Sequence, residues 1–269
     1  MLILITNTCH MDCPHCMECS SPEPQHMTWA HIEKSCEFAI RHGSSTVLLS
    51  GGELTCHPDW NRAARLFAPH FLNVLLSTNG AWLGSPVEDE MLALLRECPT
   101  VNLQISSFPG LYREYDRISS AVKPFAQRLK AAGLKHRMAF ESIRSILDEK
   151  MLALGRACEH EDLRALAAKS NVTASCIVSS IVSAQVPLDD VIHALEMRGK
   201  FCRPVIDCKG LLHWSESMLC PSFASLDEPD GEIVRKAHEW RPCGKCEGFK
   251  KFLARTDPQY VAGRAVLGF

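Results

Sequence analysis

The residues with the clearest potential for chemistry are three cysteines near the start of the chain. Cys9, Cys13 and Cys16 follow one another in the spacing Cys-x3-Cys-x2-Cys, directly after the apolar run at residues 2–5. A structural zinc site uses four protein ligands, whereas three thiolates on an iron-sulfur cluster leave one iron open for a further ligand. The spacing therefore predicts a catalytic iron-sulfur site. A zinc site, with Cys13 and Cys16 joined by the later pair Cys243 and Cys246, is the alternative.

Polar and glycine-rich segments follow three further apolar runs. Ser-Gly-Gly-Glu at residues 50–53 follows the run 47–49, and Ser-Thr-Asn-Gly at residues 77–80 follows the run 74–76. Ser106 ends the run 101–105. In barrels and partial barrels, functional groups gather on loops at the carboxyl ends of the strands. We therefore expect these segments and the cysteines at one edge of a sheet.

Together and in this order, these features resemble the radical SAM superfamily. The resemblance implies that Cys9, Cys13 and Cys16 are thiolate ligands of a 4Fe-4S cluster, and that S-adenosylmethionine occupies the iron left open. One position departs from the family pattern, because His15 stands where an aromatic residue usually precedes the third cysteine. This departure concerns local packing.

The same resemblance implies contacts to the cofactor. The backbone of Gly51 and Gly52 is expected near the methionyl end, where glycine permits close approach, and Glu53 is expected to accept a hydrogen bond from the ammonium group. The family often continues with proline, and Leu54 replaces it here. The other candidates for hydrogen bonds to the cofactor are Asn79 and Ser106.

The family's chemistry defines the expected function. The reduced cluster would pass an electron to the sulfonium and cleave it, giving a 5'-deoxyadenosyl radical that abstracts hydrogen from the substrate. The expected substrate is a peptide, a protein side chain or a small metabolite. An external electron donor such as flavodoxin or ferredoxin is the expected partner.

A second group of cysteines lies near the carboxyl end of the chain. A hairpin is predicted from Cys208 through residues 211–214 and a Ser-Glu-Ser turn to Cys220, and Cys243 and Cys246 follow as a close pair. This pattern resembles a shortened twitch or SPASM-like region, which implies an auxiliary 4Fe-4S cluster. A four-cysteine zinc site is the alternative, and Cys202 is an alternative to Cys208 as ligand.

The expected fold is α/β, a partial (βα)6 TIM-like barrel with a small cysteine-rich appendage, because short apolar runs alternate with amphipathic segments. Residues 1–199 would form the barrel and residues 200–269 the appendage. The expected strands are residues 2–5, 46–49, 71–76, 101–105 and 134–140; the expected helices begin near Thr28, Asp59 and Ser85 and continue at residues 121–132, 141–169 and 189–198. Residues 172–186 fit either a strand or a helix. A capping box is predicted from Ser85 and Glu88, with Pro86 at the first helical position.

Composition narrows the classes of protein. The 269 residues are 46% hydrophobic with a net charge of -2, which predicts a packed core and no electrostatic footprint for nucleic acid or membrane. The chain has fourteen cysteines and its first residues do not have the pattern of a signal peptide. A cytoplasmic protein with metal-bound thiols is therefore expected. Cys36 and Cys98 are expected as buried side chains on helices, and Cys56 more as packing than as a reactive thiol. A zinc-stabilised binding protein is the non-enzymatic alternative.

Overall fold

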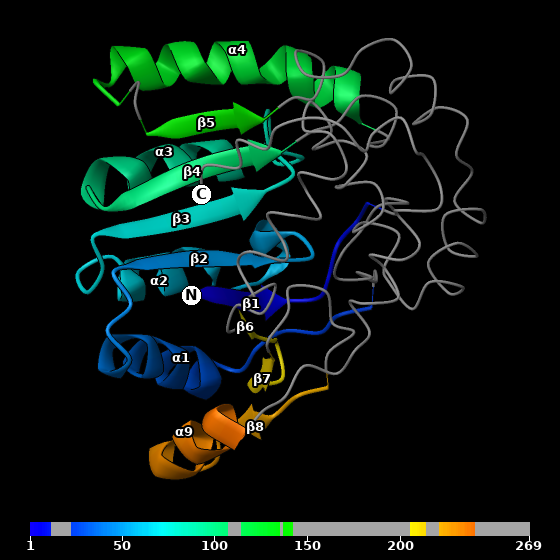
Figure 1. The fold of residues 1–269 in the computed structure, drawn as a ribbon. Coiled ribbons are helices and arrows are strands. Elements are labelled where there is room, and N and C mark those ends of the chain that lie inside the picture. Colours follow the sequence, from blue (N-terminus) through cyan, green and yellow to red (C-terminus); the bar gives the residue numbers. More distant parts are fainter. Residues whose placement is uncertain (12–22, 107–113, 135–136, 142–204, 214–220, 240–269) are drawn as a thin grey trace, which may run out of the picture.

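The computed structural model describes residues 1–11, 23–106, 114–134, 137–141, 205–213 and 221–239. These residues form a mixed α/β structure around one sheet of eight strands in the order β5-β4-β3-β2-β1-β6-β7-β8. In Figure 1 the strands β1 to β5 run in the same direction, with helices α2 and α3 behind the sheet.

Five consecutive parallel strands make up most of the sheet: β1 (Leu2–Thr6), β2 (Thr46–Gly51), β3 (Asn73–Thr78), β4 (Val101–Ser106) and β5 (Met138–Glu141). Each pairs in parallel with the next along the chain. Among the described residues the sheet is open, with β5 and β8 at its edges. The predicted α/β class with a parallel sheet is therefore confirmed. Glu141, expected to begin a helix at 141–169, instead ends β5, and the rest of that segment lies outside the described residues together with 172–186 and 189–198.

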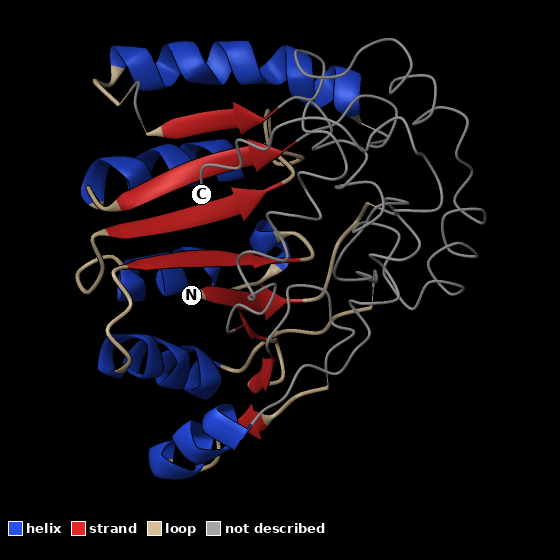
Figure 2. Ribbon diagram, viewed as in Figure 1, coloured by secondary structure: helices blue, strands red, loops and turns tan. Residues whose placement is uncertain are grey.

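The helices between these strands cover one face of the sheet, as Figure 2 shows. They are α1 (Trp29–Arg41), α2 (Trp60–Phe67), α3 (Val87–Glu97) and α4 (Tyr115–Ala131), with a short 3-10 turn, η1, at Leu54–Cys56. Alternate strand residues such as Ile3, Leu49 and Leu76 are fully buried beneath them. A smaller cluster of Leu2, Leu4 and Val205 packs on the opposite face. This alternation follows from the two-residue period of a strand.

The local signals for helix starts are borne out with one shift. Thr28 caps α1, because its hydroxyl accepts from the His31 backbone N–H at 3.3 Å. The cap of α3 is displaced from the predicted box: the Ser85 hydroxyl accepts from Val87 N–H at 3.3 Å, and the Glu88 carboxylate accepts from Gly84 N–H at 2.8 Å. The helix therefore begins at Val87, one residue after Pro86.

Three other element boundaries differ from the expected ones. The third strand begins at Asn73, because Phe71 stacks on Phe67 at the end of α2 with ring centroids 5.7 Å apart. Helix α4 begins at Tyr115, six residues before the expected start, because Tyr115 and Ile118 extend the buried stripe of that helix. The fifth strand begins at Met138 instead of residue 134.

The segment after residue 204 continues the same sheet. Strand β6 (Val205–Ile206) pairs in parallel with β1, and β7 (Leu211–His213) and β8 (Ala224–Ser225) follow antiparallel, before helix α9 (Asp230–Glu239). The turn at Asp207 to Gly210 therefore joins β6 to β7, and the predicted Ser-Glu-Ser turn, which lies in the chain between the antiparallel strands β7 and β8, is outside the described residues. The Asp207 carboxylate accepts from the backbone N–H groups of Lys209 and Leu211 at 2.9 and 2.8 Å and lies 3.1 Å from His213 Nε2. A carboxylate that closes its own turn in this way fixes the position of the hairpin.

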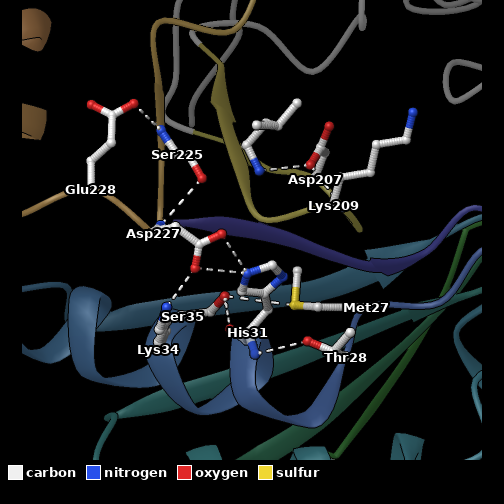
Figure 3. Close-up of polar contacts among 11 residues, drawn as sticks. Met27, Thr28, His31, Lys34, Ser35, Asp207, Lys209, Ser225, Asp227 and Glu228 are labelled. Atoms are coloured by element: carbon white, nitrogen blue, oxygen red, sulfur yellow. Dashed lines mark hydrogen bonds and ion pairs between the residues drawn. The ribbon is translucent and has the colours of Figure 1, made fainter.

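Helix α1 holds this late segment in place. Figure 3 shows His31 and Lys34 of α1 directed at the Asp227 carboxylate, with contacts of 3.3 and 2.5 Å. The His31 ring also lies under Gly210, where an added Cβ would come within 2.9 Å of Nδ1. Gly210 has φ +77°, so both its conformation and its neighbour favour glycine.

Candidate active site at the carboxyl edge of the sheet

The carboxyl ends of the parallel strands meet at one edge. Register pairs join Thr6 to Gly51 and Ser106 to Glu141, and Thr78 lies opposite Ile105. The strand ends that carry the sequence motifs are therefore neighbours, as expected. In Figure 1 the arrowheads of β1 to β5 mark this edge.

The loop that leaves β1 has a closed base. Asn7 N–H donates to Gln25 O at 2.8 Å, Thr6 forms an antiparallel bridge with His26, and Gln25 N–H donates to the Thr8 hydroxyl at 2.9 Å. The chain thus leaves the sheet and returns to the same place. Cys9 begins the excursion, whereas Cys13 and Cys16 lie outside the described residues.

The sulfur of Cys9 accepts hydrogen bonds from two N–H donors. The side chain is 7% exposed, and its Sγ accepts from the Met11 backbone N–H at 3.3 Å and from the Asn79 side-chain amide at 3.7 Å. A neutral thiol needs no such donors, but a thiolate is stabilised by them. The surroundings of Cys9 therefore fit a metal-bound thiolate, and Cys9 with Cys13 and Cys16 would hold the cluster that the sequence predicts.

Glu53 ties the end of β2 to the end of β3. Glu53 is 1% exposed, and its Oε1 accepts from the Thr78 hydroxyl at 2.7 Å and from the N–H and hydroxyl of Thr55 at 3.1 and 2.8 Å. Its Oε2 accepts from Asn79 N–H at 2.8 Å. The carboxylate thus accepts from the protein's own donors, and among the described residues Asn79 N–H is the one donor to Oε2, which leaves that oxygen a second acceptor position there.

The two glycines are required by the loop from β1. A Cβ on Gly51 would lie 2.2 Å from Thr6 O, and one on Gly52 would lie 2.5 Å from Thr8 O. The backbone N–H groups of Gly52 and Glu53 donate to these same two carbonyl oxygens, each at 2.9 Å. The close approach is therefore to the base of the cysteine loop, which lies directly against β2.

Ser106 and Cys208 lie at separate places in the fold. Ser106 ends β4 two strands away from Gly51, at the same edge. Cys208 lies in the β6–β7 turn, half-buried against the main core. Cys202, Cys220, Cys243 and Cys246 lie outside the described residues, and within those described no group of three or more Cys, His, Asp or Glu is arranged to hold a metal ion.

Two other cysteines keep their protons at neutral pH. Burial, followed by the charge of Glu53, raises the pKa of Cys56 to about 11, although its contact with His10 opposes the shift. Burial, followed by the charge of Glu37, likewise raises the pKa of Cys36 to about 11. Both thiols therefore fit the expected packing role better than metal ligation.

Two threonines complete the site; Thr6 was not identified from the sequence, and Thr78 only as part of the Ser-Thr-Asn-Gly segment. The Thr78 hydroxyl donates to Glu53 and accepts from Gly80 N–H at 3.1 Å and Trp82 Nε1–H at 2.9 Å. Thr6, 1% exposed, donates to Gln25 O at 3.0 Å. Strand alternation is a usable signal for both, since it places each of these polar side chains at a buried strand end.

Comparison with known proteins agrees with the predicted family and fold. A family model described as the Radical SAM superfamily matches residues 3–147, more than half of the chain. No curated protein sequence matches. No helix within the described residues is long and apolar enough to span a membrane.

Several solved structures share the fold at low sequence identity. BtrN in complex with AdoMet and 2-DOIA has a TM-score of 0.51 at 12% identity, over 94% of this chain and 85% of that one. SuiB of Streptococcus suis bound to the precursor peptide SuiA has a TM-score of 0.58 at 13% identity, over 93% and 66%. The protein anSMEcpe with bound AdoMet and the Cp18Cys peptide has a TM-score of 0.53 at 14% identity, over 94% and 86%.

Proposed function

The chain belongs to the radical SAM superfamily, and on that premise we propose that it uses S-adenosylmethionine to abstract hydrogen from a peptide or protein substrate. As a member, it is an S-adenosylmethionine-dependent radical enzyme, and membership implies a 4Fe-4S cluster. When bound, that cluster supplies the electron that splits the sulfonium and generates the 5'-deoxyadenosyl radical. The observation that carries the proposal is Cys9, a buried thiol with two N–H donors at the end of β1.

The chain's own residues would hold and shield this chemistry. Cys9, Cys13 and Cys16 would ligate the cluster. The closed base of the loop, with Thr8 bound to Gln25, would fix the point where the loop leaves the sheet. The backbone next to Gly52 and the remaining acceptor site of Glu53 would bind the methionyl end of the cofactor.

Peptides are the proposed substrate class because two of the three structures described above contain one. SuiB was solved with SuiA, and anSMEcpe with Cp18Cys. BtrN, which this chain matches over 85% of its length, was solved with 2-DOIA instead, and this keeps a small metabolite as the second candidate. An external donor such as flavodoxin or ferredoxin would supply the electron.

An auxiliary 4Fe-4S cluster on Cys208, Cys220, Cys243 and Cys246 is the second part of the proposal. Its support is the spacing of these cysteines and the resemblance to twitch or SPASM-like regions. A zinc site on the same residues is the alternative, with residues 200–269 as the appended region in either case.

Anaerobic reconstitution tests the radical chemistry and the auxiliary cluster. About eight iron and eight sulfide per chain support two 4Fe-4S clusters, and about four of each with one zinc support a zinc-held tail. A Cys13→Ala variant should lose one cluster and all reductive cleavage of S-adenosylmethionine, while Cys36→Ala should retain both. Colourless protein that contains only zinc would refute the enzymatic proposal.

A further inference from the structure

We infer that Asn79 is a positioning residue for the cluster. Its side-chain amide donates to the Cys9 sulfur and raises the reduction potential of the cluster. This inference rests on the proposed function, because it requires the cluster at Cys9. The observation is the contact of 3.7 Å between Asn79 Nδ2 and Cys9 Sγ, made between the ends of β3 and β1. A hydrogen bond to a ligand sulfur tunes the potential of an iron-sulfur cluster.

The orientation of the Asn79 amide is fixed independently of the cysteine. Its Oδ1 accepts from Ala81 N–H at 2.9 Å, and only the amide oxygen can accept there. The amino group must then point the other way, toward Cys9. The hydrogen bond from Ala81 N–H therefore identifies which atom of the Asn79 side-chain amide is the oxygen and which is the nitrogen.

The backbone of Asn79 is also held. Its N–H donates to Glu53 Oε2 at 2.8 Å, and the neighbouring Gly80 N–H donates to the Thr78 hydroxyl at 3.1 Å. Asn79 is 8% exposed and Cys9 is 7% exposed. In such a buried place a hydrogen bond to sulfur is electrostatically stronger than in water.

The neighbouring strand lets the amide reach this far. In the sheet, β2 lies between β1 and β3. Because Gly51 and Gly52 have no side chains, the backbone from Thr6 to Thr8 packs directly on the end of β2. This packing brings Cys9 within reach of a residue two strands away.

The sign of the effect follows from charge. Reduction adds one negative charge to the cluster and its thiolates, and an N–H dipole aimed at a ligand sulfur stabilises the more negative state. The Asn79 amide should therefore make the cluster easier to reduce. Its loss should move the midpoint potential to a more negative value.

The test uses the reconstituted full chain and two variants of Asn79. Asn79→Leu removes the donor, and Asn79→Asp replaces it with a carboxylate, which keeps an acceptor for Ala81 N–H and adds a negative charge beside the sulfur. The matched controls are Asn73→Leu and Asn73→Asp, because Asn73 begins the same strand. It lies about 20 Å away, beyond the Debye length at physiological salt.

The readouts are iron and sulfide content and the midpoint potential of the cluster, measured by redox titration with EPR detection. We expect Asn79→Leu to lower the equilibrium constant for reduction roughly threefold to tenfold, where tenfold is 59 mV for a one-electron couple, and Asn79→Asp to lower it at least as far because of its added charge. The Asn73 controls should match the wild type. A loaded cluster with an unchanged potential in both Asn79 variants would overturn the inference, whereas a wild type that binds no iron would overturn the proposed function instead.

A measurement on the wild type decides the matter if neither Asn79 variant loads a cluster. Protein labelled with 15N only at asparagine side-chain amides should show a 15N coupling to the reduced cluster in pulsed EPR. The absence of this coupling would overturn the inference. The Asn73→Leu variant, labelled in the same way, should retain it.

Discussion

Replacing the Glu53 carboxylate by an amide should loosen the ends of β2 and β3. In the Glu53→Gln variant one amide oxygen can still accept from Thr55 and Thr78. The amino group must then face Asn79 N–H, which now donates to Oε2 at 2.8 Å. Two donors would face each other in a place that is 1% exposed in the wild type.

The magnitude follows from the hydrogen bonds that change. An unsatisfied buried N–H costs about 1–3 kcal/mol, and the bonds that remain lose part of their charge-assisted strength. We therefore expect the free energy of unfolding to fall by about 2–4 kcal/mol. The matched control is Glu33→Gln, because Glu33 is an exposed glutamate that accepts from Trp29 Nε1 at 2.6 Å. That substitution should cost less than about 1 kcal/mol, since exposed groups recover hydrogen bonds to water.

The assays are urea unfolding of both variants and hydrogen exchange at the backbone N–H of Asn79. The Glu53→Gln variant should show an unchanged m-value, a lower midpoint and faster exchange at Asn79. If Glu53→Gln and Glu33→Gln have the same stability, and Asn79 exchanges at the wild-type rate, then Glu53 does not join the two strand ends.

Three further predictions concern the loop base, the hairpin turn and the third strand. In urea unfolding, Gly52→Ala should lower the free energy of unfolding by about 3 kcal/mol or more, because its Cβ would lie 2.5 Å from a backbone oxygen. The control is Gly43→Ala, which should lower it by only about 1–2 kcal/mol, because Gly43 has φ +67° and a Cβ there would meet no atom within 4 Å. Equal losses would contradict the steric argument. The pKa of Asp207 lies below its usual 3.8: burial would raise it, but hydrogen bonds from His213 and two backbone N–H groups lower it. The ionised Asp207 therefore stabilises the fold above that pH, and this contribution is lost as the pH falls through the folded pKa. The free energies of unfolding of wild type and Asp207→Asn should therefore differ most above the usual pKa of an aspartate and converge as the pH falls through the lower, folded pKa, and a constant difference would refute the shift. In urea unfolding, Phe71→Ala should lower the free energy of unfolding by about 3–5 kcal/mol, because Phe71 is buried. Leu72 is 83% exposed, so Leu72→Ala should change that free energy by less than about 0.5 kcal/mol. The reverse order would show that the start of β3 is assigned incorrectly.

Local patterns in the sequence predicted most of the parallel sheet. The alternation of apolar runs with amphipathic segments located β1, β2 and β4 almost to the residue, because burial of one helical stripe and alternate strand positions leaves a periodic record. The boundaries of β3 and α4 were wrong because Phe71 and Tyr115 are buried through tertiary packing that no local period records.

The order of the motifs also predicted the candidate site in outline. Parallel strands place their carboxyl ends at one edge, so segments that follow successive apolar runs must be neighbours. This reasoning brought Cys9, Gly51, Glu53, Asn79 and Ser106 to one edge of the sheet, where the structure has them.

By itself, then, the sequence determined the class of fold, the family and the edge at which chemistry is expected. Only the tertiary structure decided that the Asn79 amide points at the Cys9 sulfur, that Glu53 joins two strand ends, and that β6 pairs with β1. The physical reason is that propensity and periodicity act over a few neighbouring residues. A hydrogen bond between residues 70 positions apart depends instead on the sheet order, the register and the missing side chains of two glycines.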